Sequence, residues 1–452
     1  MADKKLDPIK VGIIGYGTVG TGVVKILSEN SDLIKKRLGH DIAVEKICDI
    51  DIERERGVDI DRSVLTTDIK EIIENPDISI VVETVGGIDI AQELILSAIR
   101  SGKNVVTANK ALLAEAGEEI YRAAHEAGVD INFEASVGGG IPIIRTLKEG
   151  LVGDRVEFIF GITNGTCNYI LTRMTDDGMA FAEALKEAQE LGYAEADPTL
   201  DIEGIDSAHK LAIIIPITYG VKVDFEDIYV EGISKIDPID IEFAGEMGYK
   251  VKLLSILKDT EEGIEARVHP TLIPFRYLLS NVSFNLNAIY IRGKAVGTIL
   301  LYGQGAGMMP TGTAVVSDVI ELSRNVISKT KKRVPPLSFD YADIKKVKPK
   351  PMEEVVTNYY LRVSALDKPG VLSKISGILG KFNISIASVI QKGRAEGHED
   401  VPIVMMIHEA REKDIRKALK EIDALDVINR PSIFIRIEDT AMKKGGRKDE
   451  WR

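Results

Sequence analysis

Asp206 and Lys210 are the pair of residues in this sequence whose types and spacing best suit proton transfer. They stand four positions apart, so on one helix their side chains share a face. Oxidation of an alcohol requires a group that takes the hydroxyl proton as hydride leaves, and a lysine can do this where burial or a like charge lowers its pKa. Glu195 precedes the pair in a proline-containing loop that can fold over the same face. By spacing alone the pair also fits a surface salt bridge, so both interpretations stay open.

A glycine-rich turn near the N-terminus has the spacing of a dinucleotide-binding motif. Residues 9–14 are predicted to form a buried strand that runs directly into Gly15, Gly17 and Gly20, after which a helix begins. Gly15 permits a tight turn, Gly17 lets a pyrophosphate approach the backbone, and Gly20 lets helix and strand pack closely. The helix N-terminus offers free amides to phosphates, so this position between a strand and a helix favours a nicotinamide cofactor.

The residues after the second predicted strand bear on the choice between NAD and NADP. Asp49 ends that strand, where an acid binds the ribose hydroxyls and repels the additional phosphate of NADP. Arg54 and Arg56 lie just downstream and can serve a 2′-phosphate instead. The sequence therefore favours NAD slightly and leaves NADP open.

Composition limits the classes of protein that this chain can belong to. With 452 residues we expect two or three domains. A formal net charge of −12 argues against a nucleic-acid partner, and the two cysteines, Cys48 and Cys167, make neither a disulfide framework nor a zinc cage. Residues 1–8 lack an apolar signal core, and the longest apolar run, 211–220, is far shorter than the ~20 residues of a membrane span. We therefore expect a cytoplasmic protein without a membrane partner.

Predicted strands and helices alternate along the first third of the chain, which indicates a parallel sheet with right-handed crossovers. We predict a Rossmann-like, doubly wound first domain over residues 1–137, onto which a late helix over 311–326 packs back, so that 311–330 belongs with it. The predicted strands are 9–14, 42–47, 78–82, 105–106 and 131–133, and the predicted helices are 18–37, 91–101 and 111–127.

The pattern changes at residue 138. Residues 138–310 are predicted to form a mixed α+β domain for substrate binding and dimerisation, with strands over 155–161 and 280–291 and helices over 181–191 and 205–215. Residues 331–355 have many prolines and lysines and are typical of a linker. The order βαββαβ over 356–438 predicts a ferredoxin-like domain, followed by a frayed tail over 439–452. Its strands are predicted at 359–365, 384–390, 403–408 and 432–437, and its helices at 371–382 and 412–424.

The stretch around Asp206 resembles the signature of homoserine dehydrogenases. In that signature AxxxGYxEx(D)P, a D, GxD and a final K recur in order, and residues 188–210 fill every position. Residues 107–110 resemble the family's segment with a second active-site lysine, and 161–170 resemble its substrate loop. Residues 303–311 resemble its late glycine loop near the cofactor. The resemblance covers roughly residues 9–325.

The resemblance implies interconversion of L-aspartate 4-semialdehyde and L-homoserine with NAD or NADP. It implies that Lys210 exchanges the proton at the substrate oxygen, that Lys110 lies beside nicotinamide and substrate, and that Asp206 orients the two lysines. It assigns to the substrate Glu195, which binds the ammonium group, with Gly165, Thr166 and Tyr193. It assigns to the cofactor Gly15, Gly17, Thr18, Val19, Gly20, Asp49, Thr84, Lys110 and Gly303.

Two further segments resemble regulatory or structural parts of known proteins. The loop containing Glu134, Val137, Gly139 and Ile141 resembles the family's sodium loop, in which one carboxylate and backbone carbonyls hold a structural ion. The C-terminal unit resembles the ACT domain, a sensor of small molecules. There the resemblance implies that Asp367, Gly370 and Asn383 lie near an amino-acid effector such as threonine, although a purely dimerising module stays possible. A homodimer or homotetramer is expected.

Three alternative functions remain to be distinguished. One is a dehydrogenase of another small amino acid, and a second is an amino-acid sensor whose dehydrogenase body no longer turns over. The third is a semialdehyde dehydrogenase with Cys167 as nucleophile, for which we find no histidine placed to activate the thiol. His209 adjoins Lys210 but points away from the Asp206 face, so we expect it to pack rather than react.

Overall fold

The computed structural model describes residues 7–391 and 400–439, so the predicted tail, apart from Asp439, lies outside the described residues. The chain forms two compact units. The first contains residues 1–156, 206–228 and 286–348, and the second contains residues 157–205, 229–285 and 349–452. In the described residues no helix is both long and apolar enough to cross a bilayer.

A parallel sheet of six strands forms the centre of the first unit, in the order β3-β2-β1-β4-β5-β6. Because the strand order reverses beside β1, the sheet is doubly wound and has a switch point between β1 and β4, as predicted. The strands are β1 (Ile9–Ile14), β2 (Ile42–Cys48), β3 (Leu65–Thr66), β4 (Ile78–Glu83), β5 (Asn104–Thr107) and β6 (Ile131–Asn132).

The helices of the first unit differ from the prediction at two breaks. The predicted helix 18–37 is two helices, α1 (Thr18–Glu29) and α2 (Ser31–Leu38), because the backbone leaves the helical region at Asn30. The predicted helix 111–127 is likewise divided at Ala116 into α5 (Lys110–Glu115) and α6 (Gly117–Ala127). The others are α3 (Lys70–Ile73), α4 (Asp89–Arg100), α7 (Ile143–Arg145), α11 (Ile205–Tyr219) and α13 (Met308–Ser328).

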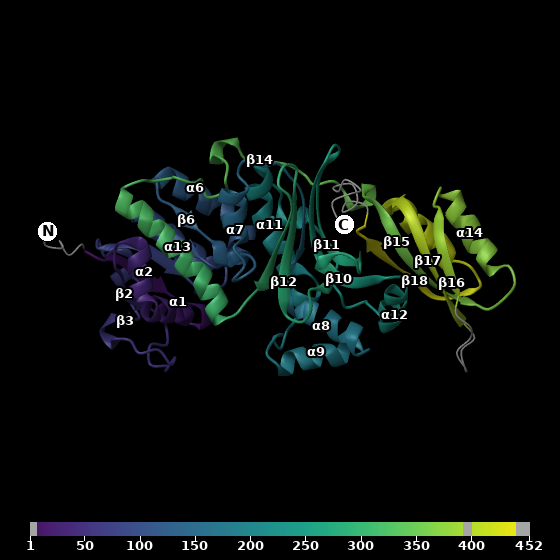
Figure 1. Cartoon of the computed structure of the whole chain (residues 1–452), viewed down its shortest axis with the longest axis horizontal. Helices are drawn as coiled ribbons and strands as arrows, with labels where there is room; N and C mark the ends of the chain where they lie inside the picture. The colour runs from purple at the N-terminus through teal and green to yellow at the C-terminus, as the bar shows by residue number, and fades with distance from the viewer. Residues whose placement is uncertain (1–6, 392–399, 440–452) are drawn as a thin grey trace. The chain divides into compact units, whose positions relative to one another are not determined.

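Helix α13 packs along α1 in the first unit (Figure 1). The two backbones approach so closely that a Cβ atom on Gly22 would lie 2.3 Å from the carbonyl oxygen of Met308. Buried aliphatic side chains of both helices, such as Val23 and Val319, cover the sheet together. The predicted linker contains a short strand, β14 (Lys345–Lys346), which pairs with β8 (Val221–Lys222).

The predicted strand 280–291 is wrong in its first half. Residues Leu278–Asn281 form a 3₁₀ turn in the second unit, and strand β12 (Leu286–Gly293) begins only after it, paired with β13 (Gly297–Gln304) in the first unit. Phe284 just before β12 has a φ of 57°, which is incompatible with a continuous strand.

The second unit is built on a sheet in the order β7-β10-β11-β18-β15-β17-β16, with β9 paired to β11. The part of this unit that precedes residue 349 contains β7 (Val156–Ile162), β9 (Tyr229–Val230), β10 (Tyr249–Thr260) and β11 (Gly263–Pro274). Its helices are α8 (Gly165–Asp176), α9 (Phe181–Glu190), α10 (Thr199–Ile202) and α12 (Pro238–Glu246). Strands β10 and β11 are buried along most of their length, as expected for the centre of a sheet.

The C-terminal part of the second unit has the predicted βαββαβ order (Figure 1). Its elements are β15 (Val356–Leu366), α14 (Val371–Lys381), β16 (Ile386–Gln391), β17 (Asp400–Arg411), α15 (Glu412–Asp423) and β18 (Ile428–Ile437). Its antiparallel sheet continues into β11, because Thr271 and Leu272 pair with Arg436 and Ile437 of β18. The C-terminal βαββαβ part and the preceding part of the unit therefore share one sheet.

Candidate active site

The glycine turn lies at the carboxyl end of β1, where its three glycines are required for different reasons. Gly15 has a φ of +96°, and a Cβ atom on Gly20 would lie 2.1 Å from the carbonyl oxygen of Gly15. A Cβ atom on Gly17 would meet nothing within 4 Å, so its backbone is open to a ligand. Thr84 closes the turn from the end of β4 by donating its hydroxyl to the Gly15 carbonyl at 2.8 Å. The turn thus fits a pyrophosphate at the N-terminus of α1.

The carboxylate of Asp49 and the guanidinium of Arg56 lie together beside the turn. The Asp49 carboxylate accepts the backbone N–H of Tyr16, and its other oxygen lies 3.5 Å from the Arg56 guanidinium. Arg56 also donates to the Tyr16 carbonyl and stacks over the Tyr16 ring, with 9% of its side chain exposed. The residue expected to favour NAD, Asp49, and one expected to favour NADP, Arg56, therefore lie side by side next to the glycine turn, whereas Arg54 is exposed.

Two lysines converge on one buried carboxylate. Asp206, 5% exposed, accepts the Lys210 ammonium at 2.6 Å on one oxygen and pairs with the Lys110 ammonium at 2.9 Å on the other. Burial alone would raise the pKa of Asp206, but the ammoniums of Lys210 and Lys110 outweigh it and hold that pKa well below its usual range. Asp206 and Lys210 thus form a buried ion pair. The alternative interpretation of their spacing, a surface salt bridge, does not hold.

The elements that carry these residues are fixed by side-chain caps. Lys110 is the first residue of α5, whose N-terminus is capped by Asn109, and the Asn109 amide also donates to the Gly87 carbonyl at 2.5 Å. Glu83, fully buried at the end of β4, accepts the Thr107 hydroxyl at 2.6 Å and the backbone N–H of Val85. Glu83 therefore ties the ends of β4 and β5 together beside Lys110, a contact that no local pattern in the sequence indicated.

The side chain of His209 extends from α11 to α5. Its Nε2 is 3.0 Å from the Glu115 carboxylate, and its ring lies 4.5 Å from that of Phe225. Burial lowers the pKa of His209 although Glu115 opposes the shift. The ring packs as expected, and it also provides a second tie between the helices that hold Lys110 and Lys210.

The residues of the predicted substrate loop lie at the start of α8, which begins at Gly165. The side chain of Asn164 caps this helix by accepting the Cys167 N–H at 2.8 Å, and its amide donates to Asp201 at 2.7 Å. Thr166 donates its hydroxyl to the Tyr193 carbonyl at 2.6 Å. Glu195 is exposed in the following loop.

Cys167 is fully buried, and its thiol donates to the carbonyl of Asp201 at 3.1 Å. This contact ties α8 to helix α10, which contains Asp201. A buried, hydrogen-bonded thiol has the surroundings of a structural cysteine.

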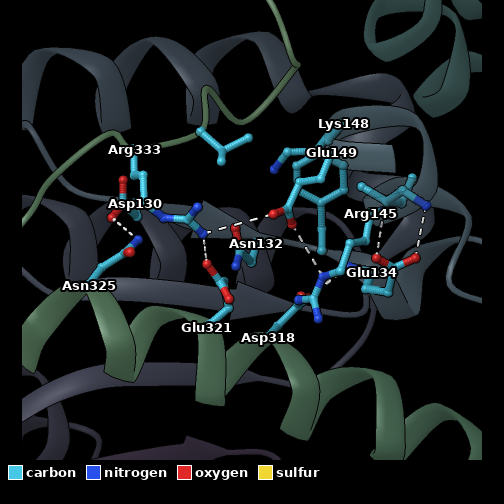
Figure 2. A pocket seen from close by; sticks show the side chains of 13 residues that line it. Asp130, Asn132, Glu134, Arg145, Lys148, Glu149, Asp318, Glu321, Asn325 and Arg333 are labelled. Atoms are coloured by element: carbon cyan, nitrogen blue, oxygen red, sulfur yellow. Dashed lines mark hydrogen bonds and ion pairs between the residues drawn. The ribbon is translucent and has the colours of Figure 1, made fainter. Parts of the chain in front are cut away.

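The predicted sodium loop packs against the late glycine loop. Gly139 has a φ of +53°, and a Cβ atom there would lie 2.5 Å from the backbone of Gly305, while Gly303 lies beside Ile141. The carboxylate of Glu134, however, accepts the N–H groups of Ile144 and Arg145, each at 2.8 Å (Figure 2).

Glu134 and Asp318 are both buried and line the same polar pocket (Figure 2). Burial, with the nearby Asp318 carboxylate, raises the pKa of Glu134 to about 7. Burial likewise raises the pKa of Asp318 to about 6, and its carboxylate accepts the backbone N–H of Glu134 at 2.7 Å. Among the described residues no three His, Cys, Asp or Glu side chains are grouped to hold a metal ion.

The predicted effector residues lie at the two ends of α14. Gly370 precedes the helix with a φ of +88°, Asp367 lies in the turn before it, and Asn383 follows the helix in the left-handed region with a φ of 59°. All three residues are exposed.

A doubly wound dinucleotide fold, two lysines on a buried aspartate and a terminal βαββαβ domain define a nicotinamide-dependent oxidoreductase with a regulatory domain. Comparison with protein families matches residues 15–134 to "Homoserine dehydrogenase, NAD binding domain", 142–320 to "Homoserine dehydrogenase" and 359–427 to "ACT domain". The homoserine dehydrogenase of Neisseria gonorrhoeae is 46% identical over 96% of this chain and 99% of its own. That of Pseudomonas aeruginosa is 44% identical over 96% of this chain and 99% of its own. The chain belongs to the homoserine dehydrogenase family.

Solved structures agree with this assignment. A homoserine dehydrogenase from Thiobacillus denitrificans has a TM-score of 0.89 and 45% identity, covering 96% of this chain and 99% of its own. A hyperthermophilic archaeal homoserine dehydrogenase in complex with NADPH has a TM-score of 0.59 and 27% identity, covering 70% of this chain and 98% of its own. The predicted fold class, family and NAD(P)-dependent dehydrogenase activity are confirmed by these similarities.

Proposed function

We propose that Lys210 exchanges the proton at the substrate oxygen while L-homoserine and L-aspartate 4-semialdehyde are interconverted. Bound NAD or NADP supplies the acceptor or donor of hydride. In the oxidation, the neutral amine of Lys210 takes the hydroxyl proton as hydride leaves the adjoining carbon for the cofactor; in the reduction, the Lys210 ammonium gives its proton to the oxygen as hydride arrives. The observation that supports this role is the buried Asp206 carboxylate, 2.6 Å from the Lys210 ammonium. That carboxylate stabilises the positive charge that Lys210 gains with the proton.

Lys110 acts from the other side of Asp206 in this proposal. With 44% of its side chain exposed, its ammonium can reach a ligand while it remains paired to the carboxylate. Asp206 is then a positioning residue for both lysines. For the substrate we propose that Glu195 holds the ammonium group, with Gly165, Thr166 and Tyr193 shaping the rest of the pocket.

The residues around the glycine turn fit a dinucleotide. We propose that Gly15, Gly17, Thr18, Val19, Gly20, Thr84 and Gly303 contact it, with Asp49 at the ribose. Because Arg56 lies beside Asp49, we propose that both NAD and NADP are accepted.

Four further proposals concern the surroundings of the reaction. A sodium ion is held by oxygens of Glu134, Val137, Gly139 and Ile141, chiefly by backbone carbonyls, because the Glu134 carboxylate already accepts two N–H groups. An amino acid such as threonine regulates the enzyme through the ACT domain. The enzyme works in the cytoplasm as a homodimer or homotetramer, and light scattering that finds only monomer at micromolar concentration would exclude this assembly.

A steady-state assay of L-homoserine oxidation tests the function, with NAD and NADP compared side by side at equal concentration. We expect turnover with both cofactors. Folded protein that binds dinucleotide but oxidises no homoserine would refute the proposed reaction, and oxidation of a different small amino acid would replace the substrate. The same assay in NaCl and in choline chloride tests the sodium ion.

A further inference from the structure

A cavity of about 620 Å³ lies within the second unit, between the ACT domain and the segment around β9. Strand β18 and helix α15 provide one side of it, and the segment from β9 to α12, together with the turn after α10, provides the other. Its apolar lining comes from Ile205, Val230, Pro270, Ile433, Phe434 and Ile435. Charged side chains of both signs also line it, namely Glu203, Glu231, Lys235 and Arg416.

Two of these charges are not neutralised within the described parts of the chain. Glu203 is half-buried, yet no hydrogen bond or ion pair with residues 7–391 or 400–439 engages its carboxylate. The same holds for the exposed ammonium of Lys235. The partly desolvated charge of Glu203 costs free energy without a partner, and a ligand of opposite charge recovers that cost.

Arg416 is held in place at the cavity by its own contacts. It donates from Nε and Nη2 to Glu412, at 3.0 and 2.7 Å, and from Nη2 to the Tyr229 hydroxyl at 3.1 Å. These bonds leave Nη1 available, and 44% of the side chain is exposed. A fixed guanidinium with a remaining N–H pair is a suitable partner for a carboxylate.

We propose that this cavity binds a small zwitterionic α-amino acid as an effector, with its carboxylate on Arg416 and Lys235 and its ammonium on Glu203. The apolar lining accommodates the side chain of the amino acid. The inference deepens the proposed regulation by an amino acid and rests on it. It places the effector at a site different from the exposed turns of Asp367, Gly370 and Asn383.

A buried ionic network keeps the cavity walls together. The Arg436 guanidinium, 1% exposed, donates to Glu412 at 2.5 Å and to Glu231 at 2.8 Å. It also donates to the Tyr229 hydroxyl at 3.1 Å, which in turn donates to Glu231 at 2.8 Å. The network joins α15 and β18 of the ACT domain to β9, so the two walls respond to a ligand together.

The cavity is directly connected to the loop that we assign to the substrate. Ile233 donates its N–H to the Ile202 carbonyl at 2.8 Å, and a Cβ atom on Gly232 would lie 2.2 Å from the same oxygen. Asp201, the residue before Ile202, accepts the Asn164 amide that caps α8 at its start. A ligand that draws Glu203 toward the cavity therefore also moves Asp201 and, through Asn164, the start of α8 that contains Thr166. Because we assign Thr166 to the substrate, we expect a change in the KM for homoserine.

Calorimetric titration of the full-length enzyme with L-threonine, L-methionine and L-isoleucine tests the site. We expect at least one of these probes to bind, and Lys235→Ala and Glu203→Gln each to weaken its binding at least tenfold. Lys417→Ala, on an exposed lysine of α15 that does not line the cavity, serves as the matched control and should bind normally. At saturation the probe should change the homoserine KM at least threefold in the wild type but not in Lys235→Ala.

Two outcomes would overturn the proposal. One is a probe whose binding is lost in Asn383→Ala but retained in Lys235→Ala and Glu203→Gln, which places the effector at the turns of α14. The other is the absence of binding by all three probes to the wild type. Homoserine oxidation without added amino acid is measured on the same samples, so a failure of the proposed reaction is distinguished from a failure of the site.

Discussion

Replacement of Asp206 by asparagine removes the negative charge shared by Lys110 and Lys210 while it preserves the size of the side chain. Asparagine can still hydrogen-bond to one of the two nitrogens, so the change tests charge more than shape. Because the ammoniums lie 2.6 and 2.9 Å from the two carboxylate oxygens, both contacts change at once. We expect a large fall in turnover with little change in dinucleotide binding.

The magnitude follows from the distances and the burial. At an effective dielectric constant of about 20, unit charges about 3 Å apart attract by about 5 kcal/mol. Part of this attraction is replaced by a neutral hydrogen bond, which contributes about 1 kcal/mol. A loss of about 3 to 4 kcal/mol from the transition state corresponds to a fall in kcat of two to three orders of magnitude.

Steady-state kinetics of homoserine oxidation measures this loss, and fluorescence of the bound nicotinamide measures dinucleotide affinity. Asp77→Asn is the matched control, because Asp77 forms a surface pair with Lys10 at 2.9 Å and should leave kcat within twofold. Since the pKa of Asp206 is depressed below 3.8, the carboxylate stays ionised at every assay pH from 5 to 9. A kcat within threefold of wild type in folded Asp206→Asn protein would refute the role of the shared charge.

Three other predictions test the surroundings of the site. Gly20→Ala should abolish dinucleotide binding, because its Cβ atom would lie 2.1 Å from the Gly15 carbonyl oxygen, and normal affinity by fluorescence titration would contradict the close packing. Glu115→Gln should lower kcat by about threefold to tenfold, because it weakens the contact between Glu115 and His209. The control is Glu119→Gln at an exposed position, which should not change kcat. Equal kcat values in the two variants would show that His209 only packs. Glu134 favours its neutral form in the folded state, so its contribution to stability is present below pH 4.5 and is lost as the pH rises to about 7. Between pH 5 and pH 8, the free energy of unfolding measured in urea should decrease less for Glu134→Gln than for the wild type, by up to about 3 kcal/mol. The same pH dependence in both proteins would show that Glu134 titrates normally.

Local patterns in the sequence predicted the parts of the site that depend on neighbouring residues. The turn from Gly15 to Gly20 and the four-residue spacing of Asp206 and Lys210 are both local, and both have the predicted geometry. Hydrophobic periodicity could not locate the breaks at Asn30 and Ala116, because apolar residues recur at helical spacing on both sides of each break.

Contacts between distant segments were not predictable in this way. The pairs Glu83–Thr107 and Glu115–His209 are 24 and 94 residues apart, and nothing in the spacing of either pair distinguishes it from other carboxylates near hydroxyls or histidines. Glu134 was identified by resemblance, but its contact with the N–H groups of Ile144 and Arg145 depends on how α7 folds back, which no motif describes.

The energetics of the two lysines and Asp206 favour a functional over a structural explanation for their arrangement. Burying a carboxylate and an ammonium requires desolvation of both, and a buried ion pair often contributes no more stability than apolar side chains of the same volume. Lys210 has 10% of its side chain exposed and Asp206 has 7%, so this desolvation is nearly complete for both. Lys110, 44% exposed, remains accessible at the same carboxylate. A second ammonium would stabilise the buried carboxylate in a purely structural cluster as well, but such a cluster would not require that ammonium to be accessible. A proton-transfer site gains a fixed charge that favours the protonated form of Lys210 and a cation that can reach a ligand.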